Sequence, residues 1–156
     1  MLHRTAPLDD WIFVTTDPRT ALHRFVDFIN TADPLIGREV ISPDAEFLTP
    51  FSSEPFRGLD GYLQILSIMR SAFSDIQWRI DRLVTEGDVV AARFELCGTH
   101  DGEFIGNPPT GRKVAVHATN FYRFTNGLIV DEVGQPDLAG LLGQIGALSS
   151  HSPGAE

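Results

Sequence analysis

The sequence is poor in cysteine and carries no concentrated positive charge. Cys97 is the only cysteine, which excludes an internal disulfide and argues against a cysteine-based zinc site. The five histidines form no HExxH motif and no paired spacing, so we expect no metal. Acidic residues outnumber basic ones by 21 to 12, for a formal net charge of −9. We therefore expect neither nucleic acid nor an anionic membrane surface as a partner.

Long hydrophobic runs and two common catalytic motifs are also missing. No apolar run reaches membrane-spanning length, and "MLHRTAPLDD" lacks the apolar core of a signal peptide, so we expect a soluble, cytoplasmic protein. The stretch "GNPPTGRK" resembles a phosphate-binding loop only superficially, because Pro108 and Pro109 have no amide hydrogens to offer phosphate. We therefore exclude nucleotide binding. The sequence also contains no G-x-S-x-G elbow, the motif that carries a nucleophilic serine.

The chain does have ample hydrophobic material. Hydrophobic residues make up 42% of its 156 residues and include eleven phenylalanines, which suffices for one folded core. We expect an N-terminal extension at 1–16, a single domain at 17–148 and a disordered tail at 149–156.

Hydrophobic periodicity predicts helices first and an antiparallel meander afterwards. Asp17 and Pro18 have the chemistry of a helix N-cap and first position. Helices are expected at 17–33, 35–42, 58–73 and 136–146, and strands at 44–51, 76–87, 88–100, 112–124 and 128–135. Apolar residues on both faces of the 88–100 strand predict burial on both sides, with Cys97 in the core. The predicted class is α+β, with helices covering one side of a curved sheet that encloses a pocket.

The hairpin at "FTNGL" admits two registers. A two-residue turn at Asn126-Gly127 would put His117 on the same face as Glu132. A three-residue loop would put His117 on the same face as Asp131 instead, because a slip of one residue exchanges the two faces. The residues alone leave both registers open.

Several stretches resemble the SnoaL-like polyketide cyclases of the nuclear-transport-factor-2-like superfamily. The resemblance runs from about Leu22 to Gly146 and is clearest in "GTHDGEFIGNPPTGRKV", "FYRFTNGLIVDEV" and "DLAGLLGQIG". The stretches "AEFLTPFSSEPFRGLDGY" and "LVTEGDVVAARFELCGTH" also stand where the family has counterparts. The resemblance implies a cone-shaped α+β barrel, often a homodimer, with a hydrophobic cavity, and it favours the second hairpin register.

For function, the resemblance implies an intramolecular aldol condensation that closes a ring in an aromatic polyketide ester, without metal or organic cofactor. Family members use an acidic residue as general acid/base and a histidine on the preceding strand to hold the substrate. The matching positions are Asp131 and His117. The sequence departs from the family pattern at Val133, where tryptophan is common, and at Gly134, where a larger residue is usual.

These roles are chemically reasonable. A carboxylate in an apolar cavity has a raised pKa and can serve as base and then acid near neutral pH. His117 can donate a hydrogen bond to a carbonyl oxygen on which charge develops. The alternative is a solvated Asp131 and a hydrogen-bonded sheet histidine.

The other candidate site residues are a set of large or polar side chains that could reach a cavity. We expect substrate contacts from Trp78, Phe51, Phe121, Met69, Arg93, Gln135 and Asn30. Burial alone would explain the aromatic residues. An ion pair with Glu95 or Asp131 would explain Arg93, and a helix cap would explain Asn30. We assign His100 to structure, at a strand bend.

The predicted ligand is a small hydrophobic carbonyl compound. A dehydratase or hydrolase on the same scaffold, or a non-catalytic binding or dimerisation module, remains an alternative because fold does not dictate function.

Overall fold

The computed structural model describes residues 16–148, so most of the predicted N-terminal extension and all of the predicted tail lie outside the described residues. Its helices are α1 (Pro18–Thr31), α2 (Pro34–Val40), α3 (Gly58–Ala72) and α4 (Leu138–Gln144). Its strands are β1 (Ile41–Leu48), β2 (Phe56–Arg57), β3 (Gln77–Glu86), β4 (Val89–Thr99), β5 (Lys113–Thr125) and β6 (Leu128–Pro136). Across this range, no helix is both long and apolar enough to cross a membrane.

Helix α1 begins where the sequence predicts. The Asp17 carboxylate accepts a hydrogen bond from the Thr20 amide at 3.2 Å, which satisfies one of the free amides of the first turn. The helix ends at a left-handed Ala32, with φ of 54°. Its buried face carries Leu22, Phe25 and Ile29 at helical spacing and lies against the sheet.

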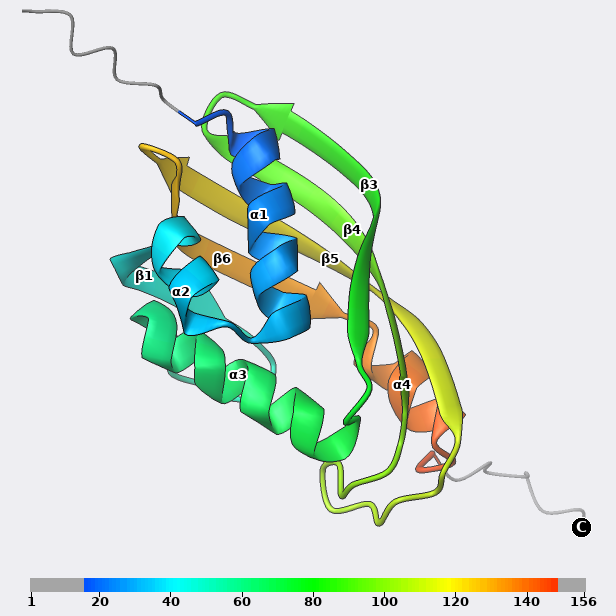
Figure 1. Ribbon diagram of the computed structural model, residues 1–156. Helices are drawn as coiled ribbons and strands as arrows, with labels where there is room; N and C mark the ends of the chain where they lie inside the picture. The colour runs from blue at the N-terminus through cyan, green and yellow to red at the C-terminus, as the bar shows by residue number, and fades with distance from the viewer. Residues whose placement is uncertain (1–15, 149–156) are drawn as a thin grey trace, which may run out of the picture.

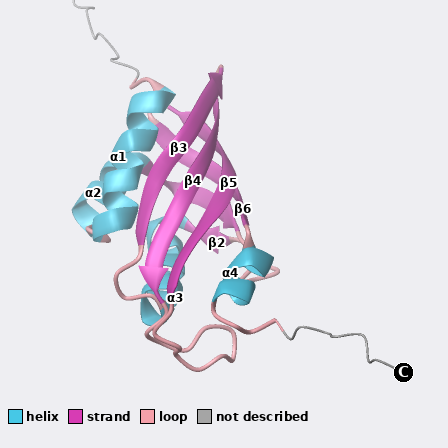
Figure 2. Ribbon diagram, turned by 90° about the vertical axis from the view of Figure 1, so that its right-hand side faces the viewer, coloured by secondary structure: helices cyan, strands magenta, loops and turns pink. Residues whose placement is uncertain are grey.

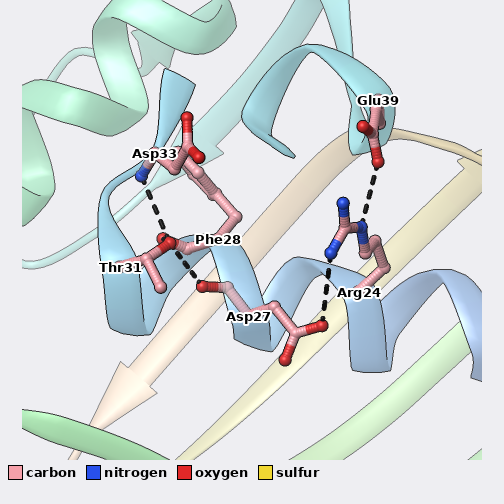
Figure 3. Close-up of polar contacts among 6 residues, drawn as sticks. All are labelled: Arg24, Asp27, Phe28, Thr31, Asp33 and Glu39. Carbon is pink, nitrogen blue, oxygen red and sulfur yellow. Dashed lines mark hydrogen bonds and ion pairs between the residues drawn. The ribbon is translucent and has the colours of Figure 1, made fainter. Parts of the chain in front are cut away.

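Polar contacts on the surface join α1 to α2 (Figure 3). Arg24 of α1 donates to Glu39 of α2 at 2.9 Å and lies 3.6 Å from Asp27. Thr31 accepts from the Asp33 amide at 3.3 Å, just before α2 begins. Because these ion pairs are exposed, their contribution to stability is small, and burial of the apolar helix faces dominates.

All six strands form one open sheet in the order β2-β1-β6-β5-β4-β3 (Figure 1). Strands β3 to β6 make the predicted antiparallel meander. Strand β1 pairs with β6 in parallel, which makes the sheet mixed. Helices α1 and α2 lie on one side of the sheet, and α4 follows the end of β6 and contacts β5 (Figure 2). The architecture is therefore the expected α+β fold with helices over one face of a curved sheet.

Strand β4 is buried on one face only, which corrects the sequence prediction. Val90, Phe94 and Leu96 face the core, whereas Arg93 and Cys97 are exposed. The apolar residues on the second face are mostly small and were a poor sign of burial. On that outer face Arg93 forms an ion pair with Asp81 of β3, rather than with Glu95 or Asp131.

The β5–β6 hairpin combines features of both predicted registers. Asn126 and Gly127, with φ of 50° and 75°, form a two-residue turn in which Thr125 pairs with Leu128. A bulge then takes up Val130, so that Arg123 pairs with Asp131. Beyond the bulge the outer face of β5 and β6 carries the odd-numbered residues, and the inner face carries Asn120, Tyr122, Glu132 and Gly134.

The core fills the space between the helices and the inner face of the sheet. Aromatic rings dominate its centre: Tyr62 of α3 makes edge-on contacts with Phe25 and Phe47, with ring centroids 5.0 and 4.7 Å apart. Phe25 in turn contacts Tyr122 of β5 at 5.5 Å. Such edge-to-face pairs are favourable beyond simple burial. They hold two phenol groups in the middle of the molecule.

Candidate active site

A cavity opens next to this aromatic cluster, between α3, α4 and the inner face of the sheet. It contains about 670 Å³ of empty space, counted out to its mouth, and about 80 Å³ open to the centre of a water molecule. Most of its walls are apolar, and the polar side chains are few. The lining residues are Thr49, Pro50, Phe51, Tyr62, Ile65, Leu66, Met69, Trp78, Leu96, Phe104, Val116, Ala118, Asn120, Glu132, Gly134, Pro136, Leu138 and Leu141.

Glu132 is the acid of this cavity. It lies on β6 beyond the Val130 bulge, opposite Tyr122, and is 3% exposed. Its Oε1 accepts a hydrogen bond from Asn120 Nδ2 at 2.7 Å, and the same nitrogen donates to the Tyr122 hydroxyl at 3.0 Å. Its Oε2 is buried and has no hydrogen-bond partner among residues 16–148. One oxygen is thus held in place while the other is free to meet a ligand.

Burial raises the pKa of Glu132 from its ordinary value of 4.5 to about 7. The low-dielectric walls disfavour the charged form, and the nearby polar groups of Tyr122, Asn120 and Tyr62 only partly oppose this effect by favouring the carboxylate. At neutral pH the group therefore populates both protonation states. Such a carboxyl can take up a proton and return it without a large energetic cost.

The two phenols remain protonated donors. Burial, followed by the charge of Glu132, raises the pKa values of Tyr62 and Tyr122 well above the ordinary tyrosine value. Tyr62 also lines the cavity. A neutral hydroxyl in an apolar site can donate to an oxygen on which negative charge develops.

Asp131 and His117 lie on the opposite face of the sheet, so the prediction that they share the cavity is wrong. The Asp131 side chain is 38% exposed and its Oδ2 lies 3.4 Å from Arg123 Nε. His117 pairs with Glu95 of β4, and neither predicted residue lines the cavity. The two do share a face, as the second register required, but it is the outer one. The bulge at Val130 turns Glu132 inward in place of Asp131.

Three of the predicted substrate-contact residues do line the cavity: Trp78, Phe51 and Met69. Phe121, Arg93 and Gln135 belong to the outer face, with Phe121 54% exposed, so for these three the prediction of a cavity contact is wrong.

Asn30 is neither a cavity residue nor a helix cap. Its side chain donates to the Trp78 carbonyl at 2.9 Å and accepts from the Trp78 amide at 2.8 Å. This pair of bonds fastens α1 to the start of β3. Asn30 therefore positions the backbone of a cavity residue instead of touching a ligand.

His100 has the structural position that the sequence suggests. It is fully buried, its ring lies 5.4 Å from that of Phe73, and its Nδ1 lies 3.0 Å from Thr110 Oγ1. These contacts close the loop between β4 and β5, which carries Phe104 onto the cavity wall. Among the described residues, no three metal-binding side chains come together as a metal site.

Sequence reasoning missed Glu132, Asn120 and the two phenols as site residues. Helical spacing in the 58–73 segment is compatible with burial of Tyr62, which is 6% exposed, but a buried tyrosine is usually plain core. Glu132 could have been proposed from the sequence, because the two-residue turn would put Glu132, and not Asp131, on the face of His117. The bulge beyond that turn has no distinctive residue pattern, and it decides which of the two adjacent acids faces inward.

Comparisons with known proteins agree with this architecture. The family model for SnoaL-like polyketide cyclase matches residues 19–145. Nogalonic acid methyl ester cyclase of Streptomyces nogalater is 32% identical over 112 residues, which cover 69% of this chain and 81% of that protein. Aklanonic acid methyl ester cyclase AcmA of Streptomyces galilaeus is 29% identical over 130 residues, covering 81% and 88%.

Solved structures extend the likeness to three dimensions. Wild-type IdmH of Streptomyces antibioticus superposes with a TM-score of 0.75 at 30% identity, covering 83% of this chain and 99% of that one. TsrD of Streptomyces laurentii superposes with a TM-score of 0.73 at 27% identity, covering 91% and 100%. With its fold, its buried acid and a family match along most of its length, the chain belongs to the SnoaL-like polyketide cyclase family.

Proposed function

We propose that this chain is a cofactor-independent cyclase that closes a ring in an aromatic polyketide ester, with Glu132 as its general acid/base. The observation that carries the proposal is a single buried carboxyl with a pKa of about 7 inside an apolar cavity. An ordinary glutamate would be too weak a base for a carbon acid and would hold too little acid form at neutral pH. This carboxyl also favours an enzyme over a passive binding module.

The proposed reaction needs two proton transfers and no oxidant. The Glu132 carboxylate removes a proton from a carbon next to a carbonyl, so that a C–H bond breaks and an enolate forms. Tyr62 donates a hydrogen bond to the enolate oxygen, which stabilises its developing charge. The enolate carbon then attacks a second carbonyl of the same molecule and forms the new C–C bond. Glu132 returns its proton to the resulting alkoxide, which restores the starting carboxylate.

Two curated relatives are named for the methyl esters of nogalonic and aklanonic acid, and this suggests the substrate class. We infer a hydrophobic polyketide ester of similar chemistry. The apolar walls, including Trp78 and Phe51, suit its ring system. Asn120 holds Oε1 of Glu132 in place, so the substrate meets a carboxylate whose direction is already set and whose Oε2 is free.

Substitution Glu132→Gln tests the proposal with nogalonic and aklanonic acid methyl esters as substrates. The amide keeps the shape of the side chain but cannot accept the proton, so kcat should fall by about 100-fold or more. Asp131→Asn is the matched control, because this neighbouring acid faces outward, and it should keep activity within about twofold of the unaltered chain. Full turnover by the Glu132→Gln protein, or loss of turnover only in the control, would contradict the assignment.

We also infer that the chain forms a homodimer through the outer face of its sheet. Register partners Val84, Ala91 and Phe121 form one row across β3, β4 and β5. Val84 and Phe121 are 59% and 54% exposed, although each is apolar. A second copy placed against this stripe would remove it from water, which is the usual reason for such a continuous patch.

A further inference from the structure

Gly134 forms part of the cavity wall beside the proposed catalytic acid, Glu132. Strand β1 ends at Leu48, which pairs with Val133, whereas β6 continues through Gly134 to Pro136. Gly134 therefore lies just past the last rung of the β1–β6 pairing. Because side chains alternate along a strand, position 134 faces the same side as Glu132, the interior.

The missing side chain leaves space directly beside the reactive groups. A Cβ at position 134 would lie 3.6 Å from Asn120 Nδ2, from Asn120 Oδ1 and from Glu132 Oε1. These are ordinary contact distances, so an alanine would fit without displacing either group. Gly134 is not among the residues of positive φ, so the backbone does not require glycine here. What the glycine provides is the space itself.

Two hollows meet at this glycine. The internal cavity and a shallow groove on the surface share Thr49, Pro50, Gly134 and Pro136 in their walls. The groove is open to solvent and offers about 320 Å³ to the centre of a water molecule, four times the 80 Å³ of the cavity. The 80 Å³ of the cavity is well below the roughly 300 Å³ at which small-molecule pockets usually begin, so the cavity alone does not hold a fused-ring substrate. Its reacting end can lie at Glu132 only if the remainder of the molecule extends out of the cavity. Position 134 leaves room for this remainder, because glycine has no side chain there.

We propose that Gly134 is the specificity-determining residue of this site. It admits elongated multi-ring substrates, whose reacting carbon lies beside Glu132 while the distal rings extend past residue 134 into the groove. The inference rests on the proposed function for the identity of the acid. It adds that residue 134 of the cavity wall limits the size of the ligand. A side chain at this position would close the passage and restrict the site to small ligands.

The test compares ligands of two sizes with variants at position 134. The probes are 1-naphthol and the longer 1-hydroxyanthraquinone, with binding followed by quenching of tryptophan fluorescence, since Trp78 lines the cavity. Gly134→Val should weaken binding of the longer probe by about tenfold or more and change the shorter one by less than about threefold. Gly134→Ala should also weaken binding of the longer probe more than that of the shorter one, but by a smaller factor than Gly134→Val. Gly143→Val and Gly143→Ala, in α4 away from the cavity wall, are the matched controls and should change neither.

Each outcome decides the proposal. A selective loss of the longer probe supports it. Equal binding of both probes by the Gly134 variants overturns it, as does an equal loss of both or a failure of the unaltered chain to bind either. Circular dichroism and thermal melting establish folding, and the alanine variant serves where valine prevents it. Binding needs no turnover, so the result is independent of the Glu132→Gln experiment. If Glu132 proved not to be the catalytic acid, the selectivity for probe size would still be observed.

Discussion

The burial of Glu132 supports its proposed catalytic role and also has a cost in stability. A glutamate at the surface would be fully charged at neutral pH, but here burial raises the pKa to about 7. The protonated form is favoured in the folded chain, while the unfolded chain loses this proton near the ordinary value of 4.5. The folded protein therefore binds more protons than the unfolded one between these two values, and stability falls as pH rises across that window.

This gives a measurable pH dependence of the free energy of unfolding. Raising the pH from 4.5 to 7 should remove about 3 kcal/mol through this one carboxyl, after which its contribution stays level. Urea unfolding of the unaltered chain and of Glu132→Gln at pH 5 and pH 8 isolates the effect, because the other titrating groups are common to both. The difference between the two proteins should widen in favour of the amide at pH 8. A difference that does not change with pH would show that Glu132 has an ordinary pKa.

At the scale of elements, the β5–β6 hairpin controls the site by a short turn and one bulge. The sequence predicted the four helices, five of the six strands and the two-residue turn option, but not β2 (Phe56–Arg57). Local signatures made this possible: Asp17-Pro18 at the start of α1, helical spacing in α3, and Asn126-Gly127. The bulge at Val130 has no comparable local signature. The parallel pairing of β1 with β6 is a long-range arrangement that no local pattern encodes. The sequence therefore could not tell which of the two adjacent acids, Asp131 or Glu132, points into the cavity, although it did indicate the family and the presence of a cavity.

The turn itself can be tested. Gly127 has φ of 75°, and a Cβ there would lie 2.9 Å from Thr16 Cβ. Gly127→Ala should lower the free energy of unfolding by about 1–2 kcal/mol, because a left-handed backbone disfavours a side chain. Asn126→Gly, at φ of 50°, is the companion variant and should change stability by less than about 0.5 kcal/mol. Denaturant unfolding measures both, and equal stability of the alanine variant and the unaltered chain would contradict the observed turn.

At the scale of the whole molecule, the two faces of the sheet have different tasks. The inner face, with Glu132 and Asn120, builds the cavity, and the outer face presents the apolar stripe across Phe121. Charged pairs such as Arg93–Asp81 and Arg79–Glu95 lie on the same outer face and give it a polar surround. An apolar centre with a charged rim is the usual make-up of a protein interface.

The dimer can be tested by light scattering coupled to size-exclusion chromatography. The unaltered chain should elute with twice the mass of one chain, and Phe121→Glu should elute as a monomer because it places a charge within the apolar stripe. Leu35→Glu is the control: Leu35 is 65% exposed on α2, on the helical side, and its substitution should leave the dimer intact. A monomeric unaltered chain, or a dimeric Phe121→Glu protein, would contradict the interface.

The parallel pairing of β1 with β6 has a consequence for how the chain matures. Ile41 is opposite Ile129, so the first long strand of the sheet must wait for the last one before it can hydrogen-bond on that side. Contacts between such distant segments form slowly. During synthesis on the ribosome, the earlier helices and the central strands can assemble while the acid-bearing segment is still unmade. The proposed catalytic centre is thus among the last parts to be completed, and a nascent chain without β6 would have neither Glu132 nor a closed cavity around it.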